Sequence, residues 1–286
     1  MEYNLCDYNT INKILTKYGF TFSKALGQNF LIDESVCPTM ADSLCADQKT
    51  GVLEIGPGIG VLTKELCKVA GKVASIELDD RLYPVLAETL ADYHNFQLIE
   101  GDVMKLDLKQ IIEEQFADCT SVKVCANLPY YITSPVVMTL LESNLPVDEI
   151  VVMVQKEAAQ RLCADIGSRD AGAVTVAVNY YGDAQILFEV GREAFMPSPK
   201  VDSAVIKITL RKTPEYKVKD ESRFFKLVNG AFAQRRKTLL NSISNSMGIS
   251  KEKVTDALDS LGLDRNIRAE KLQMVDLVNL CDLLFG

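Results

Sequence analysis

The sequence predicts an α/β fold of the Rossmann-like type, followed by a small domain that is entirely helical. Between about residues 50 and 155, short apolar runs alternate with longer segments of helical character, which is typical of a parallel sheet covered on both faces. A polar stretch near residue 212 follows, and beyond it only amphipathic helical patterns remain. We therefore expect one domain over residues 1–211, with a helical N-terminal extension, and a helical domain over residues 212–286.

Each expected element rests on the length and period of its apolar pattern. The apolar runs predict strands at 51–55, 72–77, 96–100, 121–126 and 149–154. Helical segments are expected at 61–70, 80–92, 107–117, 134–143, 155–164 and 173–181. Two later runs around a proline loop predict an antiparallel edge formed by 184–190 and 203–210. The C-terminal helices are expected at 222–234, 236–247, 251–261 and 271–285.

Bulk composition indicates an ordinary globular protein that we expect to be cytoplasmic. The chain has 286 residues, of which 48% are hydrophobic and 24% charged, and no apolar run approaches the roughly 18 residues of a membrane span. The polar N-terminus does not look like a secretory signal. A net charge of −8 argues against a strongly basic nucleic-acid binder. Local basic stretches remain at 192–212 and at 223–237, where five Lys or Arg occur without an acid.

Cysteine and histidine usage argues against a metal site and against His-dependent catalysis. The eight cysteines are scattered without a CxxC pair, and His94 is the one histidine. We expect most of the cysteines to be buried, reduced thiols and His94 to lie on the surface or in a loop.

A glycine-rich turn follows the first predicted strand. Gly56, Gly58 and Gly60 precede a helix, but Val61 stands where the dinucleotide fingerprint GxGxxG has its last glycine. The match to a nicotinamide-binding loop is therefore incomplete. A tight strand-to-helix turn uses glycine in any case, so this motif alone carries little weight.

Acidic residues at the next two strand ends give the glycine turn a context. Glu77, 21 residues after Gly56, can accept hydrogen bonds from ribose hydroxyls, and Asp102 can accept from an adenine amino group. Either Glu77 or Asp102 alone could be a solvated residue that caps a loop. Together with the glycine turn they mark one edge of the sheet and suggest a ligand with adenine and ribose but no pyrophosphate. S-adenosylmethionine fits that description.

The fourth strand ends at the same edge in Asn-Leu-Pro-Tyr. An exocyclic amino group on a base is a poor nucleophile because its lone pair is delocalised into the ring. We expect the Asn127 side-chain oxygen and the Leu128 carbonyl to accept its two N–H bonds and direct the lone pair at a methyl donor. Pro129 stiffens the loop, and Tyr130 can stack on the base once it has left its own stack.

With these motifs in order, the chain resembles the KsgA-type small-subunit ribosomal RNA adenine N6,N6-dimethyltransferases. The resemblance covers nearly the whole chain. Its motifs are KALGQNFLID (24–33), EIGPGIGVLT, IELD, EGDVM, NLPYYITSP, FMPSPKVDSAV (195–205), QRRKTLLNS (234–242) and RAEKL (268–272).

The resemblance implies that two methyl groups are transferred from S-adenosylmethionine to N6 of each of two adjacent adenosines, leaving S-adenosylhomocysteine. The target would be the 3′-terminal stem-loop of 16S RNA in a partly assembled small subunit, and the enzyme a monomer without metal. It also implies that Phe195, which its own pattern places in the core, forms a second aromatic wall for the flipped base. The implied cofactor contacts are Gln28, Asn29, Leu31, Gly56, Gly58, Glu77, Asp102, Val103 and Asn127.

In a protein as acidic as this one, we expect only a few basic residues to contact the RNA phosphates. These are Lys24, Arg192, Lys200, Arg235, Arg236 and Lys237. The chain departs from the family pattern at Ala171-Gly172, where the family often has Tyr-Gly, so substrate contacts around residues 168–173 are open.

Three other functions share parts of this pattern. A large-subunit RNA adenine methyltransferase of the macrolide-resistance type would use the same Asn-Leu-Pro-Tyr chemistry, but the match beyond residue 234 favours the small-subunit enzyme. A non-catalytic ribosome-assembly factor could use the same fold, although the intact Gly56, Glu77, Asp102 and Asn127 favour catalysis. A nicotinamide dehydrogenase is disfavoured by Val61.

Overall fold

The computed structural model describes residues 3–23 and 27–286 of the chain. They form two compact units, one made of the N-terminal region through residue 159 with 185–210, and one made of 160–184 with 211–286. The sequence-based domain boundary at 211 and this grouping differ for residues 160–184, which pack with the C-terminal helices.

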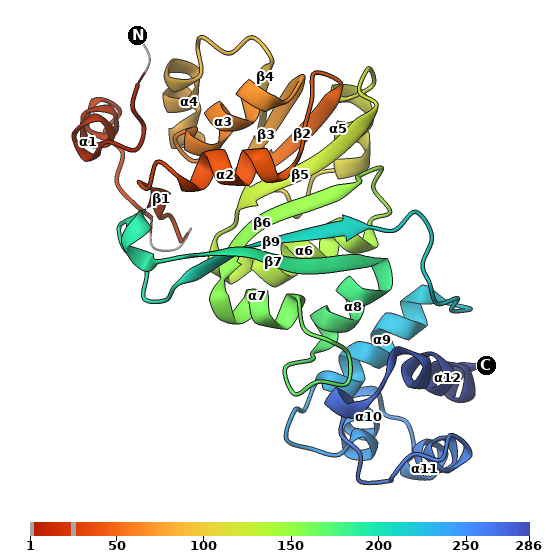
Figure 1. Ribbon diagram of the computed structural model, residues 1–286. Coiled ribbons are helices and arrows are strands. Elements are labelled where there is room, and N and C mark those ends of the chain that lie inside the picture. Colours follow the sequence, from red (N-terminus) through yellow and green to blue (C-terminus); the bar gives the residue numbers. More distant parts are fainter. Residues whose placement is uncertain (1–2, 24–26) are drawn as a thin grey trace. The chain divides into compact units, whose positions relative to one another are not determined.

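The first unit is built on a seven-stranded sheet with the order β4-β3-β2-β5-β6-β9-β7 (Figure 1). Strands β2 to β6 are parallel, as the sequence predicted. Strand β9 runs antiparallel to β6 and lies between β6 and β7, so the two late strands are neighbours at one edge of the sheet. All the predicted strands are confirmed within two residues at each end. They are β2 (Thr50–Ile55), β3 (Lys72–Glu77), β4 (Phe96–Glu100), β5 (Ser121–Asn127), β6 (Glu149–Gln155), β7 (Gly182–Val190) and β9 (Ser203–Leu210).

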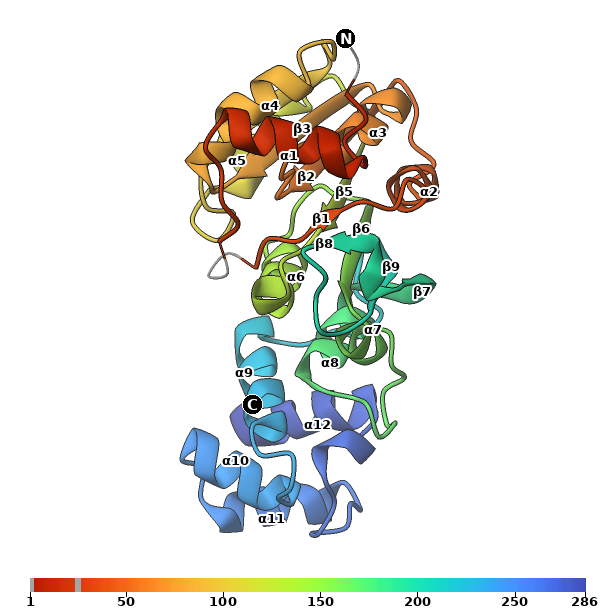
Figure 2. The same ribbon diagram turned by 90° about the vertical axis from the view of Figure 1, so that its left-hand side faces the viewer.

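Helices cover both faces of this sheet. Buried side chains of α2 and α3 pack on one face against alternate residues of the central strands, among them Val52 and Cys125. Figures 1 and 2 show α5 and α6 on the opposite face. The helices of this unit are α1 (Tyr8–Lys17), α2 (Val36–Ser43), α3 (Val61–Val69), α4 (Tyr83–Thr89), α5 (Leu108–Gln115) and α6 (Thr133–Glu142); α7 (Lys156–Leu162) follows β6.

A second, two-stranded sheet was not predicted. Strand β1 (Phe30–Leu31) pairs antiparallel with β8 (Phe195–Met196), with Leu31 opposite Phe195. The backbone N–H of Ile32 extends the pairing by donating to the Ala194 carbonyl at 2.8 Å. This sheet joins the N-terminal segment to a loop more than 160 residues away in the sequence.

The second unit consists of α8 (Ala173–Tyr181), α9 (Glu221–Phe232), α10 (Leu239–Met247), α11 (Lys251–Ser260) and α12 (Met274–Phe285). Tyr180 and Tyr181 on α8 pack against Phe224 and Phe225 on α9, with ring centroids 5.4–5.6 Å apart. This aromatic cluster explains why α8 groups with the C-terminal helices.

Several helix boundaries differ from those expected. The helix expected over 80–92 is a short 3-10 turn followed by α4 and ends at Thr89. The helix expected from residue 236 begins at Leu239 because Thr238 caps it, its hydroxyl accepting from the Asn241 N–H. The basic residues 235–237 therefore lie in a turn between α9 and α10.

The expectation for the cysteines was only half right. All eight thiols are free, but four are buried, three are half-buried and Cys45 is exposed. His94 is exposed in a turn, as predicted. No helix in the described part of the chain has the length and apolar character needed to cross a membrane.

Candidate active site

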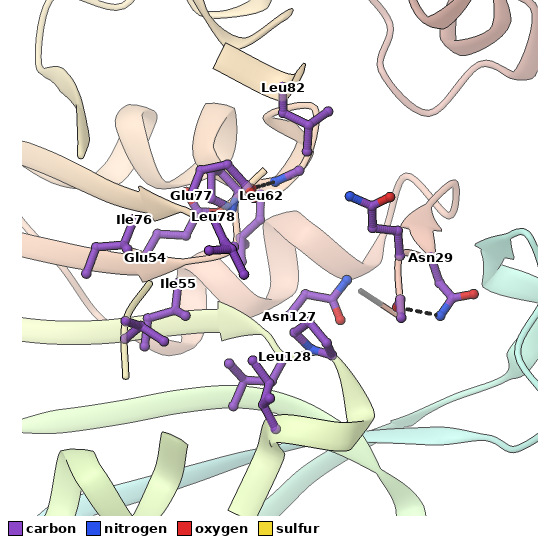
Figure 3. Close-up of a pocket in the computed structure, with 18 of the residues that line it drawn as sticks. Asn29, Glu54, Ile55, Leu62, Ile76, Glu77, Leu78, Leu82, Asn127 and Leu128 are labelled. Carbon is purple, nitrogen blue, oxygen red and sulfur yellow. Dashed lines mark hydrogen bonds between the residues drawn. The ribbon is translucent and has the colours of Figure 1, made fainter. Parts of the chain in front are cut away.

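The carboxyl ends of four neighbouring strands open into one cavity in the first unit. The order β4-β3-β2-β5 brings together Asp102, Glu77, Gly56 and Asn127, each at or just after a strand end. Figure 3 shows Glu77 and Asn127 among the residues that line the cavity. The cavity volume of about 280 Å³ is near the lower end of the roughly 300–1,000 Å³ typical of small-molecule sites. The predicted residues that line it are Gln28, Asn29, Leu31, Gly56, Gly58, Glu77, Asp102, Val103, Asn127, Leu128, Pro129, Tyr130 and Phe195.

The glycine turn keeps the backbone close to the cavity. Gly58 has φ of +59°, and a Cβ added there would lie 3.3 Å from the Phe30 ring, so both conformation and space favour glycine. Gly60 has φ of +93° and directly precedes α3, where an added Cβ would lie 3.1 Å from Leu90. Val61 begins the helix itself and needs no special backbone conformation.

Glu77 lies at the end of β3 with 7% of its surface exposed. Its Oε2 accepts from the Gly58 N–H at 3.3 Å and its Oε1 from the Asp79 N–H at 2.8 Å. Burial raises the pKa of Glu77, and the two backbone hydrogen bonds oppose that rise. Each oxygen keeps a lone pair for a further donor, as recognition of a diol requires.

Glu54, on β2, is a site residue that the sequence analysis missed. Its carboxyl is 1% exposed and lines the cavity, yet only Oε2 is used, accepting from Thr63 Oγ1 at 2.7 Å and Ser75 Oγ at 2.5 Å. Oε1 has no partner among the described residues. Burial raises the pKa of Glu54 to about 7. The sequence signal that could have identified Glu54 is a charged residue inside the otherwise apolar run GVLEI.

Asp102 and Val103 lie beyond the end of β4. The Asp102 Oδ1 accepts from the Met104 N–H at 3.0 Å, and its Oδ2 lies 3.3 Å from Lys105 Nζ. Val103 is buried. This arrangement gives a carboxylate held by its own loop beside an apolar surface, which suits a flat heterocycle with an amino group.

Asn127 ends β5, opposite Met153 on β6, and the next backbone N–H, of Leu128, donates to the Met153 carbonyl at 3.2 Å. The peptide after Asn127 is thereby tied to the sheet. Among residues 3–23 and 27–286, no group hydrogen-bonds to the Asn127 side-chain amide. In Figure 3 it is drawn between the strand ends that carry Glu54 and Glu77 and the segment that carries Asn29.

Two of the predicted aromatic residues line the cavity. The Tyr130 hydroxyl forms a 2.7 Å hydrogen bond with Ser203 Oγ, which fixes the ring. Phe195 is buried, pairs with Leu31 across the small sheet, and contributes part of its surface to the cavity. Phe195 thus belongs to the core and to the cavity wall together, whereas its pattern alone indicated only the core.

Residues 27–31 form the wall of the cavity that faces the strand ends; we call them the front wall. Gln28 Nε2 donates to Asp79 Oδ2 at 2.7 Å, and Asn29 Nδ2 donates to the Gly27 carbonyl at 3.0 Å. Phe30 and Leu31 are held by β8. The front wall is therefore attached both to the loop after β3 and to the segment around Phe195.

The oxygen-rich strand ends, the glycine turn and the unpaired Glu54 oxygen together suit an adenosine ligand that carries a positive charge. A family model for ribosomal RNA adenine dimethylases matches residues 19–284. The chain belongs to this family. Among the described residues, no cluster of His, Cys, Asp and Glu has a composition that could hold a metal ion.

Relatives within the dimethylase family are close. The chain is 48% identical over 275 residues to ribosomal RNA small subunit methyltransferase A of Geobacillus thermodenitrificans, covering 95% of this chain and 94% of that protein. It is 44% identical to the protein of the same name from Streptococcus gordonii, covering 98% of each.

Solved structures of related enzymes have the same fold. A dimethyladenosine transferase from Plasmodium falciparum superposes with a TM-score of 0.72 at 24% identity, over 88% of this chain and 95% of that one. The 23S rRNA methyltransferase ErmE superposes with a TM-score of 0.63 at 25% identity, over 90% and 100%. The Rossmann-like methyltransferase fold predicted from the sequence is therefore confirmed.

The residues predicted to contact RNA fall on both units, except Lys24, which lies outside the described residues. Arg192 and Lys200 are exposed on the first unit. Arg235, Arg236 and Lys237 are exposed on the second, where Arg235 Nη2 donates to the Arg169 carbonyl at 2.9 Å.

Charge is divided unevenly between the units. Residues 160–184 and 211–286 contain 16 Lys and Arg against 13 Asp and Glu, a net charge of +3. The other residues contain 15 and 26, a net charge of −11, and the two add to −8. The acidity that argued against nucleic acid thus belongs to the first unit.

The family departure at Ala171 lies in the second unit. Ala171 is buried, and the following residue, Gly172, directly precedes α8 and donates its N–H to Thr175 Oγ1 at 2.9 Å. A buried alanine offers no side chain to a substrate at this position.

Proposed function

We propose that this chain transfers methyl groups from S-adenosylmethionine to N6 of two adjacent adenosines in the 3′-terminal stem-loop of small-subunit ribosomal RNA. The products are dimethyladenosines and S-adenosylhomocysteine. Family membership and the relatives named small-subunit methyltransferases support the choice of RNA. The arrangement of the strand ends supports the chemistry.

The observation that carries the proposal is the Asn127 amide, which lines the cavity without a hydrogen-bond partner among the described residues. An amide that faces a cavity without an internal partner keeps its donors and its acceptor oxygen available to a ligand. In our proposal the Asn127 oxygen and the Leu128 carbonyl accept the two N–H bonds of the target amino group. Its nitrogen then becomes more tetrahedral, and its lone pair points toward the methyl donor.

The chain's other residues position the reactants. Pro129, with φ of −56°, stiffens the turn, while Tyr130 and Phe195 bound the space for the flipped base. No side chain near Asn127 needs to act as a strong base. Positioning of this kind can supply about 7–11 kcal/mol of the barrier reduction.

The cavity residues fit the proposed cofactor, which supplies an electrophilic methyl group when bound. Glu77 would accept the ribose hydroxyls and Asp102 the adenine amino group, with the glycine turn against the ligand. Gln28, Asn29, Leu31 and Val103 would complete the contacts. The unpaired Glu54 oxygen suits a positively charged ligand in a buried site.

The proposed RNA contacts are Lys24, Arg192, Lys200, Arg235, Arg236 and Lys237. Changing Arg235, Arg236 and Lys237 together to Gln should weaken RNA binding and lower its dependence on salt, by about 0.7–0.9 in slope per lost phosphate contact. The control changes three exposed lysines of the same unit, Lys212, Lys217 and Lys251, to Gln. Equal slopes for the two triple variants would place the phosphate contacts elsewhere.

The cellular setting is also a proposal. We infer a cytoplasmic monomer that acts on a partly assembled small subunit. The family and the basic second unit are consistent with a ribosomal substrate, and a role in subunit assembly can coexist with catalysis.

The decisive experiment offers the protein radiolabelled S-adenosylmethionine with unmethylated small or large ribosomal subunits and maps the modified nucleotides. We expect dimethylation at two adjacent adenosines of the small subunit. Labelling of the large subunit instead would favour the macrolide-resistance type of enzyme; this chain is similar in fold to the 23S rRNA methyltransferase ErmE. Binding to small subunits without methyl transfer would favour a non-catalytic assembly factor.

A further inference from the structure

Asp79 connects two walls of the cavity without lining it. Only 4% of its side chain is exposed, and its Oδ2 accepts from Gln28 Nε2, on the front wall, at 2.7 Å. Its backbone N–H donates to Glu77 Oε1 at 2.8 Å. One residue thus joins the front wall to the carboxylate at the end of β3, the proposed ribose acceptor.

Arg81 holds the Asp79 carboxylate from the other side. Its Nε donates to Asp79 Oδ1 at 2.8 Å and its Nη2 to Oδ2 at 2.6 Å, a two-bond arrangement that fixes the carboxylate plane. Arg81 Nη1 also reaches the Thr21 carbonyl at 3.2 Å, and the guanidinium lies 4.8 Å from the Phe20 ring centroid. These hydrogen bonds from Arg81 lower the pKa of Asp79, so it is ionised at neutral pH.

Gln28 is oriented at both ends of its amide. While its Nε2 donates to Asp79, its Oε1 accepts from the Ser23 N–H at 2.9 Å. The neighbouring Gly27 closes against the Asn-Leu-Pro-Tyr turn, since a Cβ there would lie 3.3 Å from Tyr131 Cδ1. The front wall therefore meets the β5 turn at Gly27 and is hydrogen-bonded to the β3 loop at Gln28.

We propose that Asp79 is a positioning residue for the cofactor, acting through Gln28 and Glu77. It holds the front wall against the cavity and orients the carboxylate that meets the ribose. This role rests on the proposed use of S-adenosylmethionine. Losing Asp79 should loosen the front wall, so that the cofactor binds more weakly and leaves faster.

The test compares Asp79→Asn with Asp80→Asn, the same change at the adjacent, exposed residue. Arg81 is 43% exposed and can be hydrated when Asp79 loses its charge, so we expect Asp79→Asn to remain folded. Isothermal titration with S-adenosylhomocysteine should show a Kd raised about tenfold for Asp79→Asn, the loss expected for one hydrogen bond to a charged group. Asp80→Asn should bind as the wild type does. In kinetics, KM for S-adenosylmethionine should rise while kcat changes little.

Exchanging the donor and the acceptor between positions 28 and 79 separates a positioning role from a general effect on stability. Gln28→Glu alone places two carboxylates face to face and should weaken binding as Asp79→Asn does, which also serves if Asp79→Asn fails to fold. The double variant Gln28→Glu with Asp79→Asn restores a donor opposite an acceptor, and the new Glu still accepts from Ser23. It should regain most of the affinity lost in either single variant.

The outcomes distinguish this inference from the proposed function. Wild-type affinity in folded Asp79→Asn, or no recovery in the double variant, would overturn the role of Asp79 while leaving cofactor use intact. Absence of binding by the wild-type protein would instead overturn the cofactor assignment on which the inference rests.

Discussion

Polar residues at the two ends of the parallel sheet differ in how fully they are hydrogen-bonded. At the amino end, Asn95 precedes β4 and donates to the carbonyls of Cys67 and Ala70 at 2.9 and 3.0 Å. At the carboxyl end, Asn127 is the last residue of β5, and its side chain has no hydrogen-bond partner among the described residues. The same residue type is thus satisfied at one end and left available at the other.

The acidic residues show the same contrast. Glu149, which begins β6, accepts from Lys123 at 2.9 Å and from Lys207 at 2.8 Å, and both lysines also donate to carbonyls at the end of α2. Glu54, on β2 beside the cavity, has one oxygen without a partner. Polar groups at the amino end stabilise the fold, whereas those at the carboxyl end keep hydrogen-bonding capacity that a ligand can use.

The largest effect expected from this contrast is on catalysis. Asn127→Ala should lower the rate of methyl transfer by about 10³-fold, since it removes a preorganised acceptor for the reacting amino group. Its free energy of unfolding should stay within about 0.5 kcal/mol of the wild-type value because no internal hydrogen bond is lost. Methyl incorporation at saturating cofactor and a urea titration measure the two quantities.

Asn95→Ala is the matched control for that experiment. It leaves two helix-end carbonyls unpaired and should lower the free energy of unfolding by about 1–2 kcal/mol, with the rate nearly unchanged. Near-normal turnover in Asn127→Ala would refute the role of Asn127. A large rate loss in both variants would show that the two ends of the sheet do not differ in function.

Much of the carboxyl edge could be predicted because it depends on local pattern. Strand length, period and direction determine that residues after parallel strands share an edge, so Gly56, Glu77, Asp102 and Asn127 could be grouped without knowing strand order. Glu54 was not predicted as a site residue because a single acidic residue inside an apolar run is consistent with many structures. Only the three-dimensional environment reveals that it is buried with an unpaired oxygen.

Long-range pairing was the part that could not be predicted. Strands β1 and β8 are two residues each, too short for a period, and are far apart in the sequence. The grouping of α8 with the C-terminal helices depends on contacts between Tyr180, Tyr181 and residues of α9, which no local pattern reports. The start of α10 depended on whether Thr238 would act as a cap.

A second, smaller effect is expected at the amino end. Glu149→Gln should lower the free energy of unfolding by about 3 kcal/mol at pH 7, since Lys123 and Lys207, with only 12% and 14% of their side chains exposed, lose their ionised partner. Methyl transfer per folded molecule should be unchanged. Glu113→Gln, in an exposed pair 4.0 Å from Lys109, is the control and should change stability by less than about 0.5 kcal/mol.

The pH dependence of this effect has a definite sign. Burial opposes ionisation of Glu149, but the hydrogen bonds from Lys207 and Lys123 outweigh it and lower the pKa of the carboxyl. The stabilisation is therefore present above the unfolded pKa, about 4.5, and is lost as pH falls through the folded value. A stability difference between wild type and Glu149→Gln that grows on acidification would contradict the ion-pair account.

The smallest expected effect is that of Glu54→Gln at the carboxyl end of the sheet. Its dependence on pH is opposite in sign to that of Glu149→Gln. Burial raises the pKa of Glu54 from 4.5 to about 7, so the folded protein binds a proton that the unfolded chain has lost. This contribution to stability is fully present below pH 4.5 and is lost as pH rises through about 7, a loss of about 2 kcal/mol between pH 5 and pH 7. Glu54→Gln cannot ionise, so urea titrations should show its stability rising relative to the wild type across that interval. A difference independent of pH would mean that burial does not raise the pKa of Glu54, and the carboxyl would then be mostly ionised throughout that interval.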